Sequence, residues 1–435
     1  MDFYASLENH FPKEIASSLK VSLEKEPTHC LLLNTLKMKE DIFLSLFPKV
    51  RKHPFVEHAF YYDKTDYNFG KSILHAMGVL YIQDASAMMP AFFLSPKRGD
   101  TCIDLCASPG GKSIDSYLQT QGEITLLSND ISYPRAKELS SNFERLGIGC
   151  GVVTSLPVGK LSSLYPQSFD NVLLDAPCSG SAMFRKNELA KEDWDENKVS
   201  SCASIQKELL ENAYALLKPG GKLVYSTCSF SKEENEDNVI DFLNKHPDME
   251  LISLPEDNLF YRPSILKETV YLLPSLFEGE GQFIALLQKK GEASSLLSKK
   301  RNEKEEKGEI KNLASSFGLD YPIVLLKDSY YSLPFELPLP KEGVLRAGIK
   351  IAEKEKTLVP DHSLAHYLDS STSIPLSIKE AKSYLHGESF PLAGKEGFVL
   401  VSYQGVNLGF VKIVKGVAKN HYPKGLRFDY SKIDY

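Results

Sequence analysis

Residues 100–230 alternate short apolar runs with segments of helical periodicity, and few folds accommodate that order. Five apolar runs predict strands: 101–106, 123–128, 151–154, 169–174 and 222–225. Three periodic segments predict helices: 112–119, 133–146 and 205–217. Strands that alternate with helices build a mostly parallel sheet covered by helices on both faces. We therefore predict an α/β, doubly wound, Rossmann-like domain.

Two local patterns mark the end of one predicted element and the start of another. The helix over 205–217 should stop at Lys218-Pro-Gly-Gly221, because proline and glycine both break helices. Ser231-Lys-Glu-Glu234 has the form of a helix start, with a hydroxyl cap and a glutamate three residues later. A strand over 281–288 is expected to close the domain.

Three polar stretches follow predicted strands: Asp104–Ser113 (DLCASPGGKS), Asp175–Cys178 (DAPC) and Ser226–Cys228 (STC). In an open parallel sheet, ligands bind outside the carboxyl ends of the strands. These stretches should therefore face a single crevice.

The first of these stretches is a glycine-rich turn between a strand and a helix. Gly110 and Gly111 allow the backbone to approach a ligand, and the helix behind them offers free N–H groups. The spacing matches neither a dinucleotide-binding loop nor a phosphate loop. Asp130 ends the next strand, where acidic side chains bind ribose hydroxyls. A nucleoside ligand without a pyrophosphate, such as S-adenosylmethionine, fits this pattern. Alternatively, the glycines form only a tight turn and Asp130 caps the helix at Ser132.

Two cysteines follow two strands that should be neighbours in the sheet. Cys178 and Cys228 each come about three residues after their strand. A single cysteine in such a place is usually a buried apolar residue. Two thiols over one crevice, with Asp175 before the first, indicate nucleophilic chemistry instead, because a thiolate is a strong nucleophile.

The composition limits the classes of function. A chain of 435 residues predicts several domains, and a formal charge of −6 argues against a surface that is basic throughout, although a local basic face is allowed. The seven cysteines have no zinc-site or disulfide spacing, so we expect reduced thiols and no metal. The sequence has no secretory signal and no run of membrane-spanning length. We expect a cytoplasmic protein that does not contact a membrane.

The sequence predicts five segments. They are a small α+β N-terminal domain (1–72), the catalytic domain (73–288), a charged linker that is either an exposed helix or disordered (289–312), an intermediate domain (313–380) and a β-rich end (381–435). A hairpin is expected over 397–411, with its turn at Gln404–Asn407. Residues 411–428 carry five basic residues and no acidic one: Lys412, Lys415, Lys419, Lys424 and Arg427. This basic segment is a candidate for RNA docking.

Taken in order, DLCASPGGKS, LDAPCSGS, RKN, LLKPGGKLVYSTCS and KEENED resemble the RNA cytosine-5 methyltransferases of the Nol/Nop/Sun family. The resemblance covers residues 78–288. The closing segment, LGFVKIVKGVAKNHYPKGLR, is similar to the PUA-like RNA-binding end of the bacterial F-type small-subunit rRNA methyltransferases. The resemblance implies an S-adenosylmethionine-dependent methyltransferase domain with a PUA-like C-terminal region. It also implies 16S rRNA as the substrate and 5-methylcytosine as the product.

The resemblance assigns roles to individual residues. Cys228 adds to carbon 6 of cytosine, Cys178 helps to release the product, and Asp175 binds the ring. S-adenosylmethionine is held by Cys106, Ala107, Ser108, Pro109, Gly110, Gly111, Lys112, Asp130 and Asp175. Arg185 and Lys186 of the RKN stretch, together with the basic residues of the closing segment, contact RNA. One position departs from the family: Pro157 stands where an aspartate usually lies near the adenine amino group.

Two other functions remain open at this point. A non-catalytic ribosome-assembly factor could use the same fold only to bind RNA, but such a protein would need neither thiol. A tRNA-directed enzyme could perform the same chemistry, because the choice of RNA depends on shape and surface contacts. We expect a monomer.

Overall fold

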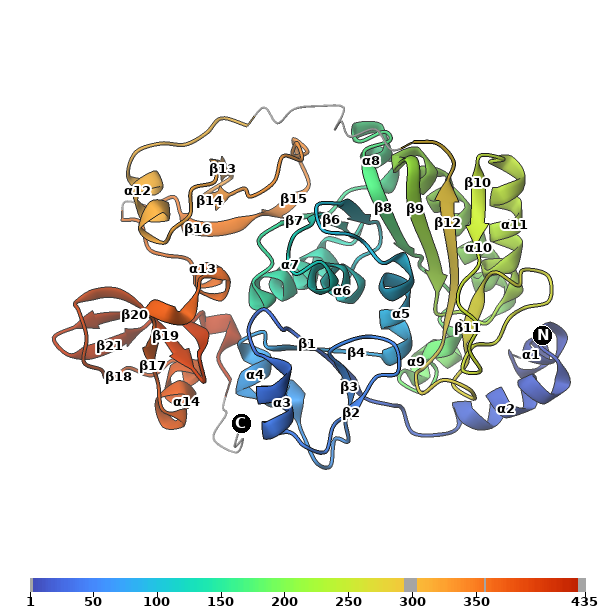
Figure 1. Ribbon diagram of the computed structural model, residues 1–435, viewed down its shortest axis with the longest axis horizontal. Coiled ribbons are helices and arrows are strands. Elements are labelled where there is room, and N and C mark those ends of the chain that lie inside the picture. The colour runs from blue at the N-terminus through green and yellow to red at the C-terminus, as the bar shows by residue number, and fades with distance from the viewer. Residues whose placement is uncertain (1–2, 293–302, 356, 429–435) are drawn as a thin grey trace.

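A nine-stranded sheet forms the centre of the computed structural model, which describes residues 3–292, 303–355 and 357–428 (Figure 1). Its strands are β5 (Thr101–Asp104), β6 (Thr125–Asn129), β7 (Gly151–Thr154), β8 (Phe169–Asp175), β9 (Leu217–Thr227), β10 (Met249–Ile252), β11 (Val270–Leu272), β12 (Gln282–Lys289) and β15 (Val344–Ala347). The order is β10-β12-β9-β8-β5-β6-β7-β15, and β11 pairs with β12. Strands β5 to β9 are parallel, while β10, β11, β12 and β15 run antiparallel to their partners. This order confirms the predicted doubly wound α/β domain.

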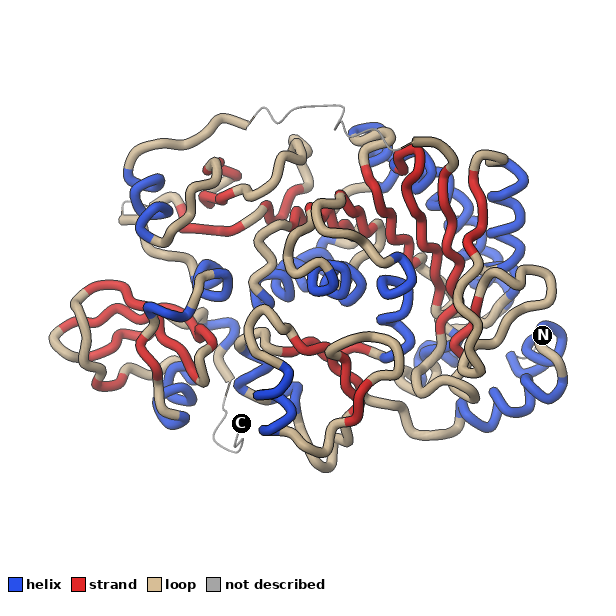
Figure 2. Tube along the Cα trace, in the orientation of Figure 1, coloured by secondary structure: helices blue, strands red, loops and turns tan. Residues whose placement is uncertain are grey.

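Helices cover both faces of the sheet (Figure 2). They are α5 (Ala85–Leu94), α6 (Gly111–Gln119), α7 (Tyr133–Leu146), α8 (Val158–Leu164), α9 (Glu188–Glu192), α10 (Glu196–Leu216) and α11 (Glu236–Lys245). Side chains of β5 alternate between the two cores: Ile103 packs with α8, α10 and α11, and Cys102 packs with α5, α6 and α7. Helix α10 begins nine residues before the predicted start, where the Asp195 side chain accepts a hydrogen bond from Lys198 N.

Helix α10 ends at Leu216, as predicted, but residues 218–221 do not separate it from the next strand, and the predicted helix start at Ser231 is wrong. Strand β9 begins at Leu217, directly after α10, and Leu217 pairs with Phe169 of β8. Pairing resumes between Lys222 and Asn171, so residues 218–221 loop out of the strand instead of separating it from the helix. Ser231 makes no capping hydrogen bond, and only a 3₁₀ turn, Lys232–Glu234, follows it. The Glu234 side chain is buried and accepts hydrogen bonds from Ser179 and Gln206, which lie far away in the sequence.

The N-terminal region has two parts. Helices α1 (Phe3–His10) and α2 (Lys13–Leu23) pack on the catalytic core, where the rings of Phe3 and Phe184 are 4.7 Å apart (Figure 1). The helical periodicity of residues 3–19 is broken at Pro12, which cannot continue a helix from the preceding turn. An antiparallel sheet in the order β2-β3-β1-β4 follows, and β4 extends it beyond residue 72. Its elements are β1 (Cys30–Leu33), α3 (Glu40–Leu46), β2 (Arg51–Lys52), β3 (Ala59–Tyr61), α4 (Ile73–Ala76) and β4 (Leu80–Gln83).

The C-terminal region contains two small sheets, β13-β14-β16 and β17-β19-β20-β21-β18. The elements are α12 (Glu309–Ser316), β13 (Ile323–Leu326), β14 (Ser329–Ser332), β16 (Ile349–Glu353), α13 (His362–Tyr367), β17 (Ile374–Pro375), α14 (Ile378–His386), β18 (Phe390–Pro391), β19 (Gly397–Tyr403), β20 (Val406–Val414) and β21 (Val417–Asn420). Strand β15 leaves this region and pairs with β7 of the catalytic sheet. The predicted hairpin is β19–β20, and its turn is only Gln404-Gly405, both with positive φ. Part of the predicted linker, 293–302, lies outside the described residues.

Helix α7 is tied to the N-terminal sheet by backbone carbonyls. Lys37 Nζ donates to Met77 O at 2.7 Å and to Arg145 O at 2.9 Å. The Arg145 guanidinium donates in turn to His75 O at 2.8 Å. Gly78 lies inside this contact with a φ of +69°, and a Cβ atom there would be 1.9 Å from Arg145 O. No helix within the described ranges is long and apolar enough to cross a membrane.

This contact predicts that Gly78→Ala destabilises the protein. Gly99 is a matched control, because its φ is +87° but a Cβ atom would meet no other atom within 4 Å. Gly99→Ala should cost about 1 kcal/mol from the backbone conformation alone. Gly78→Ala should cost about 1–3 kcal/mol more, because α7 must move away. Urea denaturation measures both changes, and equal losses would contradict the close contact at Gly78.

Candidate active site

A cavity of about 490 Å³ lies at the carboxyl ends of β5, β6, β8 and β9. Residues from all three polar stretches line it, together with side chains from α8 and α10. The lining residues are Leu105, Cys106, Ser108, Asp130, Ile131, Arg135, Pro157, Val158, Gly159, Asp175, Ala176, Pro177, Cys178, Ile205, Glu208, Leu209, Asn212 and Cys228. The structure thus brings the three stretches to one crevice, as the sequence predicts.

Cys178 and Cys228 meet in this cavity. Strands β8 and β9 pair in parallel, with Asp175 opposite Ser226, so the loops that follow them lie side by side. The two Sγ atoms are 2.9 Å apart, and both thiols are free and partly exposed. The hydrogen bond with Cys228 raises the pKa of Cys178 well above its usual value, and burial adds to the effect. Cys178 is therefore held as a thiol next to Cys228.

Asp175 is fixed by three hydrogen bonds. Its Oδ1 accepts from Ser226 Oγ at 2.7 Å and from Gln282 Nε2 at 2.8 Å. Its Oδ2 accepts from Lys112 Nζ at 2.7 Å. Burial lowers the pKa of Lys112, but the charge and hydrogen bond of Asp175 outweigh burial and leave that pKa above its usual value. The side chain of Asp175 remains 31% exposed and lines the cavity.

The glycine-rich turn supplies fewer lining residues than predicted. Cys106 and Ser108 line the cavity, whereas the lining does not include Ala107, Pro109, Gly110, Gly111 or Lys112. A Cβ atom at Gly110 would lie 2.8 Å from Leu139 Cδ1, and one at Gly111 would lie 2.7 Å from Gln83 Cδ. These glycines therefore permit close packing of the turn against the protein. Burial raises the pKa of Cys106, which keeps this third cysteine as an unreactive thiol.

The two carboxylate oxygens of Asp130 have different surroundings. Its Oδ1 accepts from Ser132 N at 2.9 Å, which is the local turn of the simpler interpretation. Its Oδ2 accepts no hydrogen bond among the described residues, although Arg135 lies 3.2 Å away as an ion-pair partner. A buried acceptor without a donor, in the wall of a cavity, suits a ribose hydroxyl. The residues present therefore fit a nucleoside such as S-adenosylmethionine.

Family models match three parts of this chain. The model described as 16S rRNA methyltransferase RsmB/F matches residues 91–288. Those described as the N-terminal domain of 16S rRNA methyltransferase RsmF and the methyltransferase RsmF PUA domain match residues 1–85 and 371–428. A relative named ribosomal RNA small subunit methyltransferase F, from Shewanella piezotolerans, is 31% identical across 98% of this chain and 96% of its own. The chain belongs to the RsmB/F family of 16S rRNA methyltransferases.

Other relatives agree with this assignment. A protein of the same name from Vibrio vulnificus is 32% identical across 91% of this chain and 90% of its own. A methyltransferase homologue from Pyrococcus horikoshii has a TM-score of 0.57 at 28% identity, across 66% of this chain and 93% of that one. NSun6 from Pyrococcus horikoshii, solved with SFG, shares the fold, with a TM-score of 0.59 at 21% identity, across 67% of this chain and 98% of that one. Membership of the RsmB/F family confirms the predicted S-adenosylmethionine-dependent RNA methyltransferase with a PUA-like end.

The position at which this RsmB/F protein departs from the family lies on the cavity wall. Pro157 precedes α8 and lines the cavity beside Val158. An apolar ring thus stands where a carboxylate is expected near the adenine. Asn212 of α10 lines the same cavity and was not identified from the sequence. No local pattern distinguishes this amide from the other polar residues of α10.

The predicted RNA contacts fall in two regions. The Arg185 side chain is only 4% exposed, and its Nε donates to Glu280 at 2.7 Å. This buried ion pair argues against a direct contact between Arg185 and RNA. Lys186 is 26% exposed and lies 3.2 Å from Asp84. The five basic residues of the closing segment are exposed on the PUA domain.

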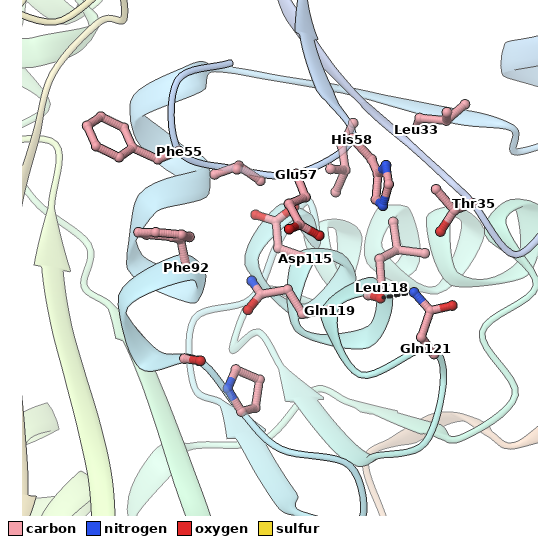
Figure 3. A pocket seen from close by; sticks show the side chains of 14 residues that line it. Leu33, Thr35, Phe55, Glu57, His58, Phe92, Asp115, Leu118, Gln119 and Gln121 are labelled. Carbon is pink, nitrogen blue, oxygen red and sulfur yellow. Dashed lines mark hydrogen bonds between the residues drawn. The ribbon is translucent and has the colours of Figure 1, made fainter. Parts of the chain in front are cut away.

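A second cavity, of about 300 Å³, lies between the N-terminal domain and helices α5 and α6 (Figure 3). Phe55 and His58 line one side, and Phe92 and Asp115 line the other. Burial raises the pKa of Asp115, and Gln83 donates to this carboxyl at 3.0 Å. Neither Cys178 nor Cys228 lines this cavity, so it is separate from the candidate active site. No group of three or more metal-binding side chains occurs in the part of the chain that the structure describes.

The cavity predicts the effect of removing the Asp130 carboxylate. Asp130→Ala should weaken the binding of S-adenosylmethionine by about 1–3 kcal/mol, because the ribose loses a buried acceptor. Isothermal calorimetry measures the affinity directly, and the exposed Asp320 provides a control substitution to alanine. An unchanged affinity in Asp130→Ala would contradict the assignment of Asp130 to the ribose.

Proposed function

We propose that this protein methylates carbon 5 of cytosine in 16S rRNA through a covalent bond between Cys228 and the base. The observation that supports this proposal most directly is the pair of thiols, 2.9 Å apart, in the cavity that also holds Asp130 and Asp175. A protein that only binds RNA needs no such pair. Family membership favours rRNA over tRNA as the substrate.

The chemistry of cytosine explains why a nucleophile is needed. Carbon 5 is too poor a nucleophile to attack a methyl group directly. Addition of Cys228 to carbon 6 moves electron density to carbon 5. The Asp175 carboxylate accepts a hydrogen bond from the amino group of the ring, and the Lys112 ammonium beside it offsets the negative charge that develops. S-adenosylmethionine, when bound, supplies the methyl group to carbon 5. The target base must leave its stack to enter the cavity.

Cys178 acts in the second half of this reaction. Loss of the proton on carbon 5 and expulsion of the Cys228 sulfur complete the reaction. A thiol at Cys178 donates a hydrogen bond to that sulfur and thereby stabilises the departing thiolate. Cys178 is thus assigned to product release and Cys228 to attack.

The PUA domain supplies a basic face for docking the RNA. Lys412 of β20 and Lys419 of β21 are directly opposite each other in the sheet. Like charges in such a pair are unfavourable unless an anion lies between them. Lys412 Nζ also lies 5.4 Å from the centre of the Phe398 ring, which itself packs against His421. Cations beside aromatic rings suit phosphates and unstacked bases.

We infer further that the protein acts as a monomer in the cytoplasm. All seven cysteines are free thiols, as expected for a reducing compartment. Cys178, Cys228, Asp130 and Asp175 line one cavity within a single copy of the chain, which supports a site formed by a monomer.

The two thiols should fail in different ways. Cys228→Ala should abolish methyl transfer and form no covalent bond to RNA, because carbon 5 is never activated. Cys178→Ala should still attack and transfer the methyl group, but it should stall before release and leave a protein–RNA adduct. Denaturing gel electrophoresis of each variant with RNA and cofactor detects the adduct.

Two outcomes would contradict these assignments. An adduct with Cys228→Ala and none with Cys178→Ala would mean that the roles are reversed. Retained methylation in both variants would remove the thiols from the mechanism and leave only a loss of stability, of about 0.5–3 kcal/mol.

The basic face predicts a loss of RNA affinity that depends on salt. Neutralising Lys412, Lys415, Lys419, Lys424 and Arg427 should weaken RNA binding and flatten its salt dependence, because fewer counterions are released. The double variant Lys412→Gln/Lys419→Gln should show part of this effect, and Lys13→Gln/Lys25→Gln, on the exposed surface of the N-terminal region, should not. Fluorescence anisotropy at several salt concentrations measures the slope. An unaltered slope would assign the closing segment a structural role.

A further inference from the structure

Glu234 is a fully buried carboxylate between the two cysteine loops. It belongs to the segment 231–234, which the sequence predicted as a helix start. Within the described residues, its carboxylate accepts hydrogen bonds from Ser179, Ser229 and Gln206. Oε1 accepts from Ser179 Oγ and from Ser229 Oγ, each at 2.5 Å. Oε2 accepts from Ser179 N at 2.9 Å and from Gln206 Nε2 at 3.0 Å.

The donors are the residues that follow the two cysteines. Ser179 comes directly after Cys178, and Ser229 comes directly after Cys228. Their hydroxyl oxygens are 3.0 Å apart, so both serines converge on the same carboxylate. Gln206 of α10 also donates to Pro177 O at 2.9 Å, which ties the Cys178 loop to the helix. A single carboxylate therefore holds both loops at the point where the thiols meet.

We propose that Glu234 is a positioning residue that fixes the distance between Cys178 and Cys228 and keeps Cys178 in its thiol form. The inference rests on the proposed function of the two thiols and extends it to a residue that contacts neither the base nor the cofactor. An ionised carboxylate accepts four hydrogen bonds and donates none, which matches its surroundings. A glutamine has the same shape but no charge, and its NH₂ group would replace one acceptor atom, either beside the two serine hydroxyls or beside Ser179 N and the Gln206 amide.

The charge of Glu234 acts on Cys178 as well. Several titratable groups interact with this thiol: Tyr225 from β9, Cys228 from the loop after β9, Asp175 from β8, and Glu234 itself. Cys202 of α10 lies near Glu234 and Cys228. Glu234 is buried without a cation among its hydrogen-bond partners, whereas Asp175 is paired with Lys112. Its negative charge therefore disfavours a second negative charge at Cys178.

The test compares Glu234→Gln with Glu236→Gln. Glu236 is an equally buried carboxyl two residues later, but it accepts from Tyr271 OH and His10 and contacts neither serine. Each change is made in the Cys228→Ala variant, and alkylation of Cys178 by iodoacetamide is followed across pH by peptide mass spectrometry. Glu234→Gln should shift the alkylation midpoint to lower pH, and Glu236→Gln should not. An unshifted midpoint in Glu234→Gln, or an equal shift in both, would overturn the proposal.

Two milder variants test the positioning role with Cys228 intact. Ser229→Ala should slow methyl transfer, and Ser179→Ala should slow the disappearance of the adduct, each by about tenfold. Equal effects of both variants on both steps would overturn the separate positioning of the two thiols. The alkylation measurement needs no RNA, so its result is independent of whether 16S rRNA is the substrate. Failure of the proposed function and failure of this inference can therefore be told apart.

Discussion

The parallel pairing of β8 with β9 is the constraint on which the active site depends. The register that places Asp175 opposite Ser226 also brings the following loops together, and these loops carry Cys178 and Cys228. A shift of this register by one residue would turn the core side chains of β8 to the opposite face, so the hydrophobic core fixes the register. The packing of the sheet therefore determines that the two thiols lie close together. The loops are held in addition by hydrogen bonds from Ser179 and Ser229 to Glu234.

Strands, helices and the convergence of the three stretches could be predicted because they depend on local periodicity and on the common geometry of parallel sheets. The helix over 133–146 and the strand over 151–154 have the predicted bounds. The errors occur where a distant partner decides the structure. Glu234 resembles a capping residue in sequence, but Ser179 and Ser229 offer it better donors. Arg185 was predicted to be a surface cation, but it forms an ion pair with Glu280, which lies almost a hundred residues later in the chain.

Strand β15 is another element whose position depends on a distant partner. No sequence pattern predicted that it belongs to the catalytic sheet. Residues 344–347 extend the sheet beyond β7, so the edge of the Rossmann-like domain is closed by a segment from the C-terminal region. Arg346 of this strand is buried and lies 3.8 Å from Glu144 of α7. Helix α7 is held at its other side by Lys37 of the N-terminal domain. The catalytic domain therefore contacts both the N-terminal domain and the C-terminal region.

Two carboxylates in the site differ in a way that suits two different tasks. Asp175 is partly exposed and paired with Lys112, so it can accept a hydrogen bond from a neutral base while the cation beside it offsets negative charge on the ring. Glu234 is buried and accepts hydrogen bonds from neutral donors. Its charge raises the pKa of Cys178, together with the larger effects of Cys228 and burial. Two chemically identical side chains, Cys178 and Cys228, are thereby given unequal surroundings. In the proposed mechanism, this asymmetry assigns attack on the base to one sulfur, while the other retains its proton for the release of the product.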